Sequence, residues 1–532
     1  MADRIDTDVV ILGGGPSGAT LALALGRRGI RTVLVDKGHE PLPGVRAGGA
    51  SSLVMTIMRT LGVEEEIRAR APVPPGWPRT SVITTGLCDR VLDVRGPRSR
   101  ADEATTAPAI MQNVPSSVLE TVLREEIARQ PSVTTLYGCT FGGDLVQDEQ
   151  GVTVVVQDDA GVPVTVRAQY AVGAEGANSP TRAAVGIGIE GHPHFTTRHT
   201  VEFVAPGLGA LHGLGDHNQY WVINEDLIAY VLHQDAGRRW TLQIEEVAPH
   251  VEPLLTDAAA LVRLAVRGDV EIEWASVRRW RANAFYASRQ RAGRVFLAGD
   301  AAHATPPGAL GLQQGIADGA DLGWKLAARL QGWGGEALLD SYEAERWSIS
   351  RALVEEVDVR GPHRLAAYAA YEGEERDAAI LEDIARRDLS RLSLGIAAHG
   401  YVYGGSPVLS GPRVATGARF SASPLAEVGK QVPHRWLPDG RALVDTPGEG
   451  LALLHGSAHD PSWFLDAGGG AGVAVSAVAL DDETMAGLLG APGARRALIL
   501  RPDAHVAWVS GEPGDGDPAV VDVVLGRVAQ TV

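Results

Sequence analysis

The chain has 532 residues, 45% of them hydrophobic and 21% charged, with a formal net charge of −17. Because one hydrophobic core rarely serves so long a chain, we expect two or three domains. The acidic balance argues against a nucleic-acid partner, no apolar run is long enough to span a bilayer, and the two cysteines have no metal-binding spacing, so we expect no metal site.

The first predicted elements occupy residues 8–36. An apolar strand, Val9–Leu12, leads into the glycine turn Gly13–Gly18; a helix follows as far as Gly29, and a second strand from Thr32 ends at Asp36. This order of strand, turn, helix, strand and acid is the dinucleotide fingerprint in its confirming context. These residues alone leave both FAD and NAD open as the ligand.

Each residue type in this stretch has a physical task. Gly13 permits the sharp turn, Gly15 lets the backbone approach a pyrophosphate, and Gly18 lets the helix pack close to the strand. The helix N-terminus offers N–H groups to phosphates, and the Asp36 carboxylate can accept hydrogen bonds from both ribose hydroxyls. The cofactor contacts predicted in this stretch are Gly13, Gly15, Pro16, Ser17, Gly18, Asp36 and Lys37.

The N-terminus lacks the layout of a signal peptide, so we expect a cytoplasmic protein. A glycine-rich loop with Arg46, which must lie close to the nucleotide turn, precedes a helix from about Ser51, and another helix starts near Val114. Strand-like runs at 133–137, 151–157 and 163–169 predict an inserted β-meander. We assign no chemistry to residues 75–112.

From about residue 186 to 280 the pattern changes to longer strand-like runs with aromatic residues. They predict adjacent antiparallel strands, with 224–226 as a turn. One face of such a sheet would cover a cavity. The residues we single out as candidate substrate contacts are His194, Tyr220, His233 and Trp240.

A second strong signal starts at Gly293. A buried strand, Val295–Ala298, delivers Gly299 and Asp300, and a helix runs from near Leu312 to Leu330. An acid at the carboxyl end of a strand beside a helix N-terminus is where an α/β sheet binds its ligand. The helix dipole there favours a negative charge on a bound ring.

The remaining chain is predicted to be helical to about residue 398, with a linker at 406–414. Residues 416–532 carry strand-like runs at 451–454, 472–478, 497–500 and 505–509, which predict a separate small α/β domain. The GGGAG run at Gly468 lacks a strand-to-helix context, so we interpret it as a loop and not as a second nucleotide site.

Three separated segments together resemble one family. The turn Gly13–Gly18, the segment Ala174–Ser179 and the motif Gly299–His303 are similar to those of single-component FAD-dependent aromatic hydroxylases of the p-hydroxybenzoate hydroxylase type. The sequence LLDSYEAER at 338–346 is also typical of that group, and the likeness covers about residues 5–400. The tail resembles the thioredoxin-like C-terminal domain of phenol and polyketide hydroxylases, here without cysteines.

The resemblance implies an α/β fold with a discontinuous Rossmann-type FAD-binding domain (1–185 and 281–400), an inserted substrate-binding β-sheet domain (186–280) and a thioredoxin-like domain (415–532). It implies that NAD(P)H reduces the flavin and that a flavin C4a-hydroperoxide hydroxylates a bulky aromatic or polyketide-like substrate. We expect a monomer or a homodimer. The FAD contacts that it adds are Arg46, Gln112, Glu175, Asp300, Pro307, Gly311, Leu312 and Gln313.

The chain departs from the family pattern at four places near the expected flavin edge. Glu175 stands where Asp is usual, Leu53 where a second arginine is common, and Ser116 where Gln is usual. The loop after the paired prolines is about one residue shorter, with Gln313 in place of Asn. FAD binding is therefore more firmly indicated than oxygenation.

Three other kinds of function stay open on these residues. An epoxidase or a Baeyer–Villiger enzyme would use the same chemistry with a different substrate pose. A flavoprotein that keeps FAD as a structural element and catalyses a non-redox cyclisation, of the decalin-forming [4+2] type, is the alternative from a different class. A plain binding protein would require a vestigial flavin site.

Overall fold

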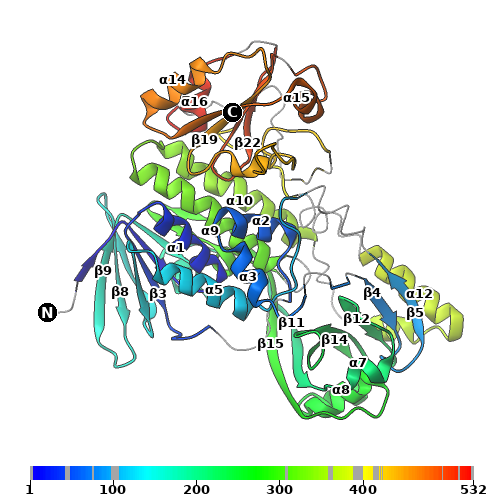
Figure 1. The fold of residues 1–532 in the computed structure, drawn as a ribbon. Helices are drawn as coiled ribbons and strands as arrows, with labels where there is room; N and C mark the ends of the chain where they lie inside the picture. Colours follow the sequence, from blue (N-terminus) through cyan, green and yellow to red (C-terminus); the bar gives the residue numbers. More distant parts are fainter. Residues whose placement is uncertain are drawn as a thin grey trace.

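Figure 1 shows the computed structural model, in which three units lie around the central helices. It describes residues 4–41, 48–74, 77–78, 80–96, 107–305, 310–356, 364–387, 400–410, 419, 421, 423–493, 495–512 and 516–528. None of the helices within these ranges is long and apolar enough to cross a bilayer.

The nucleotide-binding unit is built on a six-stranded sheet. Five of its strands are parallel, and a short antiparallel strand closes one edge. In spatial order the strands are β16 (Arg291–Ala292), β17 (Val295–Leu297), β10 (Tyr170–Gly173), β2 (Val9–Leu12), β3 (Thr32–Asp36) and β6 (Val133–Tyr137). The predicted strand–helix–strand unit is confirmed as β2, α1 (Pro16–Arg27) and β3. The run at 133–137, predicted in the meander, instead pairs with β3.

Helices and a second sheet cover the two faces of this sheet. Val9 and Ile11 pack toward the helices, whereas Val10 and Leu12 pack against the second sheet, as alternation along a strand requires. That sheet has the order β1 (Arg4–Asp6), β9 (Pro163–Ala168), β8 (Val152–Gln157) and β7 (Thr140–Gln147). The helices of this unit are α1, α2 (Ser52–Thr60), α3 (Glu64–Arg70), α5 (Ser116–Ala128), α6 (Pro180–Ala184), α9 (Gly311–Leu330) and α10 (Glu336–Glu356).

An eight-stranded sheet lies beside the nucleotide-binding unit (Figure 1). The predicted antiparallel strands are confirmed, and β4 and β5 extend the sheet beyond the expected range 186–280, with β4 parallel to β12. The order is β18 (His303–Ala304), β15 (Trp274–Ala287), β11 (Ile189–Val204), β14 (Arg239–Val247), β13 (Leu227–His233), β12 (Gln219–Ile223), β4 (Ser81–Thr84) and β5 (Val91–Arg95). Its helices are α7 (Leu208–His212), α8 (Ala258–Val266), α11 (Arg364–Tyr368) and α12 (Gly373–Arg387).

The C-terminal unit has the predicted thioredoxin-like arrangement. A parallel pair joined by a helix is followed by an antiparallel hairpin and a last helix, in the order β20 (Val475–Ala479), β19 (Leu451–His455), β21 (Ala497–Leu500) and β22 (Val506–Val509). The helices are α14 (Ser462–Ala471), α15 (Asp482–Leu489) and α16 (Ala519–Val524). The run at Gly468, predicted as a loop, lies inside α14, where a Cβ would stand 2.2 Å from Val475 Cγ1.

This unit shares one hydrophobic core with the nucleotide-binding unit. Trp324 of α9 and Leu338 of α10 belong to the same buried cluster as Leu453 of β19. Tyr403, just before the predicted linker, and Val408 within it are buried in that cluster too. The segment 400–410 is therefore packed structure, and Figure 1 shows the C-terminal unit resting on α10.

Candidate active site

The two glycine-rich signals of the sequence meet in space. β17, β10 and β2 are neighbours, so their carboxyl ends open at one edge of the sheet. A Cβ added at Gly299 or at Gly315 would lie 2.2 Å from the Ser17 hydroxyl oxygen. The early turn and the segment after β17, far apart in the chain, are therefore in van der Waals contact around Ser17.

The turn after β2 requires its glycines. Gly13 has φ +108°, and a Cβ there would lie 2.3 Å from the carbonyl oxygen of Ala174. A Cβ at Gly18 would lie 1.9 Å from the carbonyl oxygen of Gly13. Both positions permit the close backbone approach that the sequence predicts.

Gly15 is different because no heavy atom lies within 4 Å of its Cβ position. It is the N-cap of α1 and supplies no side-chain cap, and the first turn of α1 carries no acidic residue. Open space in front of uncapped helix N–H groups is the geometry that binds a phosphate. The residues present thus fit the pyrophosphate of FAD.

Asp36 ends β3 beside this turn. One carboxylate oxygen accepts a hydrogen bond from the Gly14 N–H at 2.6 Å, and the other accepts from the Gly38 N–H at 2.8 Å. Arg124, which sequence reasoning did not single out, approaches the carboxylate at 3.4 Å. Because an ionised carboxylate has about four lone-pair sites, it keeps capacity for a ribose hydroxyl beside these three donors. Lys37, next in the chain, is exposed.

We expect the Asp36→Ala variant to bind FAD about 10- to 100-fold more weakly, since hydrogen bonds to a charged group contribute about 1.5–3 kcal/mol. Fluorescence titration of the apoprotein with FAD measures the dissociation constant. Asp8→Ala is the control, because Asp8 pairs with Arg31 at the opposite end of the same strands. An unchanged affinity in the Asp36 variant would contradict the assignment.

The turn at Gly299–Ala301 carries the second predicted acid. Gly299 has φ +61°, and Asp300 is exposed at the sheet edge. Arg182 of α6 donates to the carbonyl oxygen of Ala301 at 2.8 Å and to that of Ala177 at 2.7 Å. Arg182 therefore joins this turn to the turn after β10, a role that its position in the sequence did not indicate.

Two of the predicted FAD contacts, Glu175 and Gln112, form side-chain hydrogen bonds within the protein. The Glu175 carboxylate accepts hydrogen bonds from the Ser179 hydroxyl at 2.7 Å and from the N–H of Thr181 at 3.1 Å, so it bonds the N-terminus of α6, whose N-cap is Ser179. Burial raises the pKa of Glu175 despite these bonds. Gln112 is buried, and its amide bonds Arg68 and the carbonyl oxygen of Val73. Both side chains have partners within the protein, and their predicted contacts to FAD stay predictions.

The other predicted flavin contacts lie at the start of α9. Gly311, Leu312 and Gln313 form its first turn and are half-buried. Arg46 and Pro307 lie outside the described residues.

Three of the four residues predicted to contact substrate pack together within the eight-stranded sheet unit, and their role stays a prediction. Tyr220, His233 and Trp240 cluster on one face, and the ring centroids of His233 and Trp240 are 3.7 Å apart. His212 of α7 covers them, 5.2 Å from the Tyr220 ring. Burial, then the neighbouring His212, lowers the pKa of His233 to about 4. These residues form the core under α7, while His194 is exposed at a bulge of β11.

The opposite face of the sheet lies toward the nucleotide-binding unit. Leu232, which precedes His233 and so points the other way, is the nearest neighbour of Gly48, at 3.7 Å from its Cβ position. On the same face the Trp280 indole N–H donates to the Thr200 hydroxyl at 3.0 Å, and that hydroxyl donates to Gln243 at 2.7 Å. Leu232, Gln243 and Trp280 on this face are half-buried and Thr200 is buried, whereas Tyr220 and Trp240 on the other face are both buried.

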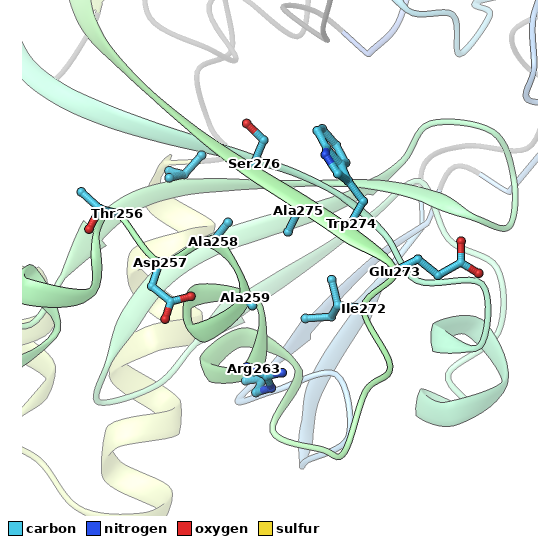
Figure 2. A pocket seen from close by; sticks show the side chains of 11 residues that line it. Thr256, Asp257, Ala258, Ala259, Arg263, Ile272, Glu273, Trp274, Ala275 and Ser276 are labelled. Atoms are coloured by element: carbon cyan, nitrogen blue, oxygen red, sulfur yellow. The ribbon is translucent and has the colours of Figure 1, made fainter.

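A surface hollow of about 680 Å³ lies elsewhere, between the start of α8 and β15. Figure 2 shows Asp257 and Arg263 on one side and Trp274 on the other. Asp257 already caps α8, and Glu273 pairs with Arg238. The hollow lies next to α8, at the end of the eight-stranded sheet away from α1 (Figure 1).

The fold and the glycine turn after β2 are those of a dinucleotide-binding protein. Comparisons with known proteins identify its family. The FAD binding domain family matches residues 6–357. Tetracenomycin B2 monooxygenase-dioxygenase of Streptomyces olivaceus is 30% identical over 99% of both chains. The flavin-dependent monooxygenase PieE, solved with FAD and substrate, is 27% identical with a TM-score of 0.87 and covers 99% of this chain and 100% of its own. The rebeccamycin biosynthetic enzyme RebC, solved with reduced flavin, has 28% identity, a TM-score of 0.84 and the same coverage.

The chain belongs to the FAD binding domain family, and it is an FAD-dependent monooxygenase. The expected resemblance, fold class and cofactor are confirmed.

Proposed function

We propose that this enzyme hydroxylates a bulky aromatic or polyketide-like compound, with NAD(P)H as the reductant. The single observation that carries the site is the contact of Ser17 with the Gly299 and Gly315 positions, because it joins both predicted halves of an FAD site. The relatives named above support the substrate class, since they include a tetracenomycin enzyme.

The chain's own residues would bind and orient FAD and the substrate. The N–H groups at the start of α1 would hold the pyrophosphate, Asp36 the ribose, and Asp300 the ribityl side. Bound FAD would supply the hydride-accepting and oxygen-activating chemistry. The first turn of α9 would place a positive dipole end near the ring, where negative charge is favoured. The sheet face with Leu232 and Gln243 would cover the substrate and limit the access of water.

One observation favours a second candidate, a non-redox cyclase that keeps FAD as a structural element. Glu175 stands at the position of the usual Asp and bonds Ser179 and Thr181 at the start of α6, so its carboxylate would meet FAD differently. The two candidates differ in whether NAD(P)H and oxygen are consumed.

Anaerobic mixing with NADPH or NADH, with and without a polyphenolic test substrate, separates them. We expect loss of the flavin absorbance near 450 nm, followed by product only after oxygen is admitted. Product formation that ignores both NAD(P)H and oxygen would establish the cyclase instead. Protein that purifies without yellow colour and binds no added FAD would contradict both.

Three further expectations from the sequence belong to this proposal. They are a cytoplasmic location, a monomeric or homodimeric state, and the absence of a nucleic-acid partner.

A further inference from the structure

Asp318 is a fully buried carboxylate in the second turn of α9. One oxygen accepts hydrogen bonds from the Gly299 N–H at 2.9 Å and from the His303 imidazole at 2.6 Å. The other accepts from the Arg346 guanidinium at 2.6 Å. The side chains of Asp318 and Arg346 are 0% exposed, and that of His303 is 1% exposed.

Arg346 extends this contact to the start of α9. Its guanidinium also donates to the Gln314 carbonyl oxygen at 3.1 Å and to the Gln314 side-chain oxygen at 2.7 Å. Its other side lies over the Tyr401 ring, 4.7 Å from the centroid. Gln314 directly follows Gln313, so the chain of contacts ends beside the predicted flavin-edge residues.

The surroundings of Asp318 favour its ionised form, which accepts all of these hydrogen bonds. Burial alone raises the pKa of a carboxyl group, but His303 and Arg346 lower the pKa of Asp318 below its usual value. A buried guanidinium without its carboxylate is strongly unfavourable, so Asp318 and Arg346 depend on each other.

We propose that Asp318 is a positioning residue for FAD binding. It holds the backbone of Gly299 directly and, through Arg346, the first turn of α9. One carboxylate therefore fixes the turn that carries Asp300 relative to the segment that carries Gln313. The inference rests on FAD binding and not on the reaction that follows.

The Asp318→Asn variant tests this in the full chain. An amide keeps the size but loses the charge, so we expect the FAD dissociation constant to rise about 10- to 100-fold and the visible flavin spectrum to shift. Asp321→Asn is the matched control, since Asp321 is buried one turn further along α9 and bonds Lys325 instead. We expect it to lower the thermal midpoint of the apoprotein while FAD affinity stays within twofold of the parent.

An unchanged FAD affinity in a folded Asp318→Asn variant would overturn the proposal, and so would equal losses in both variants. If Asp318→Asn does not fold, Gln314→Ala tests the proposal instead. It removes only the hydrogen bond from Arg346 to the Gln314 side chain. We expect a smaller loss of FAD affinity, with a lower thermal midpoint because the buried Arg346 loses one acceptor. A folded Gln314→Ala variant with unchanged affinity and spectrum would overturn the proposal.

Discussion

A Gly319→Ala variant is expected to purify largely without FAD. α9 packs against α1 at this glycine, and a Cβ there would lie 2.5 Å from the carbonyl oxygen of Ser17 and 3.0 Å from the Leu21 nitrogen. Both are backbone atoms, so no side-chain rotation relieves the clash and the helices must separate. Overpacking of this kind costs about 1–3 kcal/mol. The separation also moves Ser17 away from Gly299 and Gly315.

The ratio of flavin absorbance to protein absorbance, together with urea unfolding, measures both effects. Gly487→Ala is the control, because Gly487 lies in α15 with no heavy atom within 4 Å of its Cβ position. There an alanine should stabilise the helix by about 0.5–1 kcal/mol. A Gly319→Ala enzyme with full FAD content and parental stability would show that the close contact of α9 with α1 is not needed.

Local patterns explain what the sequence predicted well. The turn at Gly13–Gly18 is specified by residues within one short stretch, and its glycines are needed for contacts that the strand–helix–strand geometry itself imposes. The helix from Ser52 is likewise local, since Ser51 caps it by accepting from the Val54 N–H at 3.4 Å. The meeting of the two glycine signals followed from the rule that parallel strands open at one edge.

The face of the eight-stranded sheet that meets the nucleotide-binding unit could not be predicted in the same way. Alternation assigns neighbouring residues to opposite faces, but it does not say which face meets the cofactor unit. Aromatic character drew attention to Tyr220 and Trp240, whose rings form the core under α7. The half-buried face with Leu232 and Gln243 has the mixed character expected of a binding surface.

Buried charges were missed because their partners are distant in the chain. Asp318 and Asp321 occur in a helix whose other buried positions are largely apolar, a pattern that signals buried ion pairs only after the helix is known to be enclosed. The run at 133–137 was misplaced for a related reason. A short strand such as VTTLY fits a meander or a parallel sheet equally, and only the pairing with β3 decides between them.

The ion pairs that attach the C-terminal unit also join residues distant in the chain, so the sequence did not predict them. Arg501, at the end of β21, is 0% exposed and donates to Glu345 of α10 at 2.6 Å and to Asp503 at 3.1 Å. Lys325 of α9 bonds the second oxygen of Glu345 at 2.7 Å. Burial acts to raise the pKa of Glu345, but Arg501 and Lys325 lower it to about 2. The ionic cluster thus spans two units that share one core.

Replacing Arg501 by methionine should therefore lower the free energy of unfolding by about 3–5 kcal/mol, because the neighbouring carboxylates lose a buried partner. Methionine fills part of the space over the Trp324 and Tyr403 rings, so the missing charge dominates the effect. Urea unfolding followed by circular dichroism measures the loss. Arg441→Met is the control, since Arg441 is 53% exposed in its pair with Asp439 and should leave the midpoint unchanged. Equal midpoints for the two variants would mean that the cluster does not hold the C-terminal unit in place.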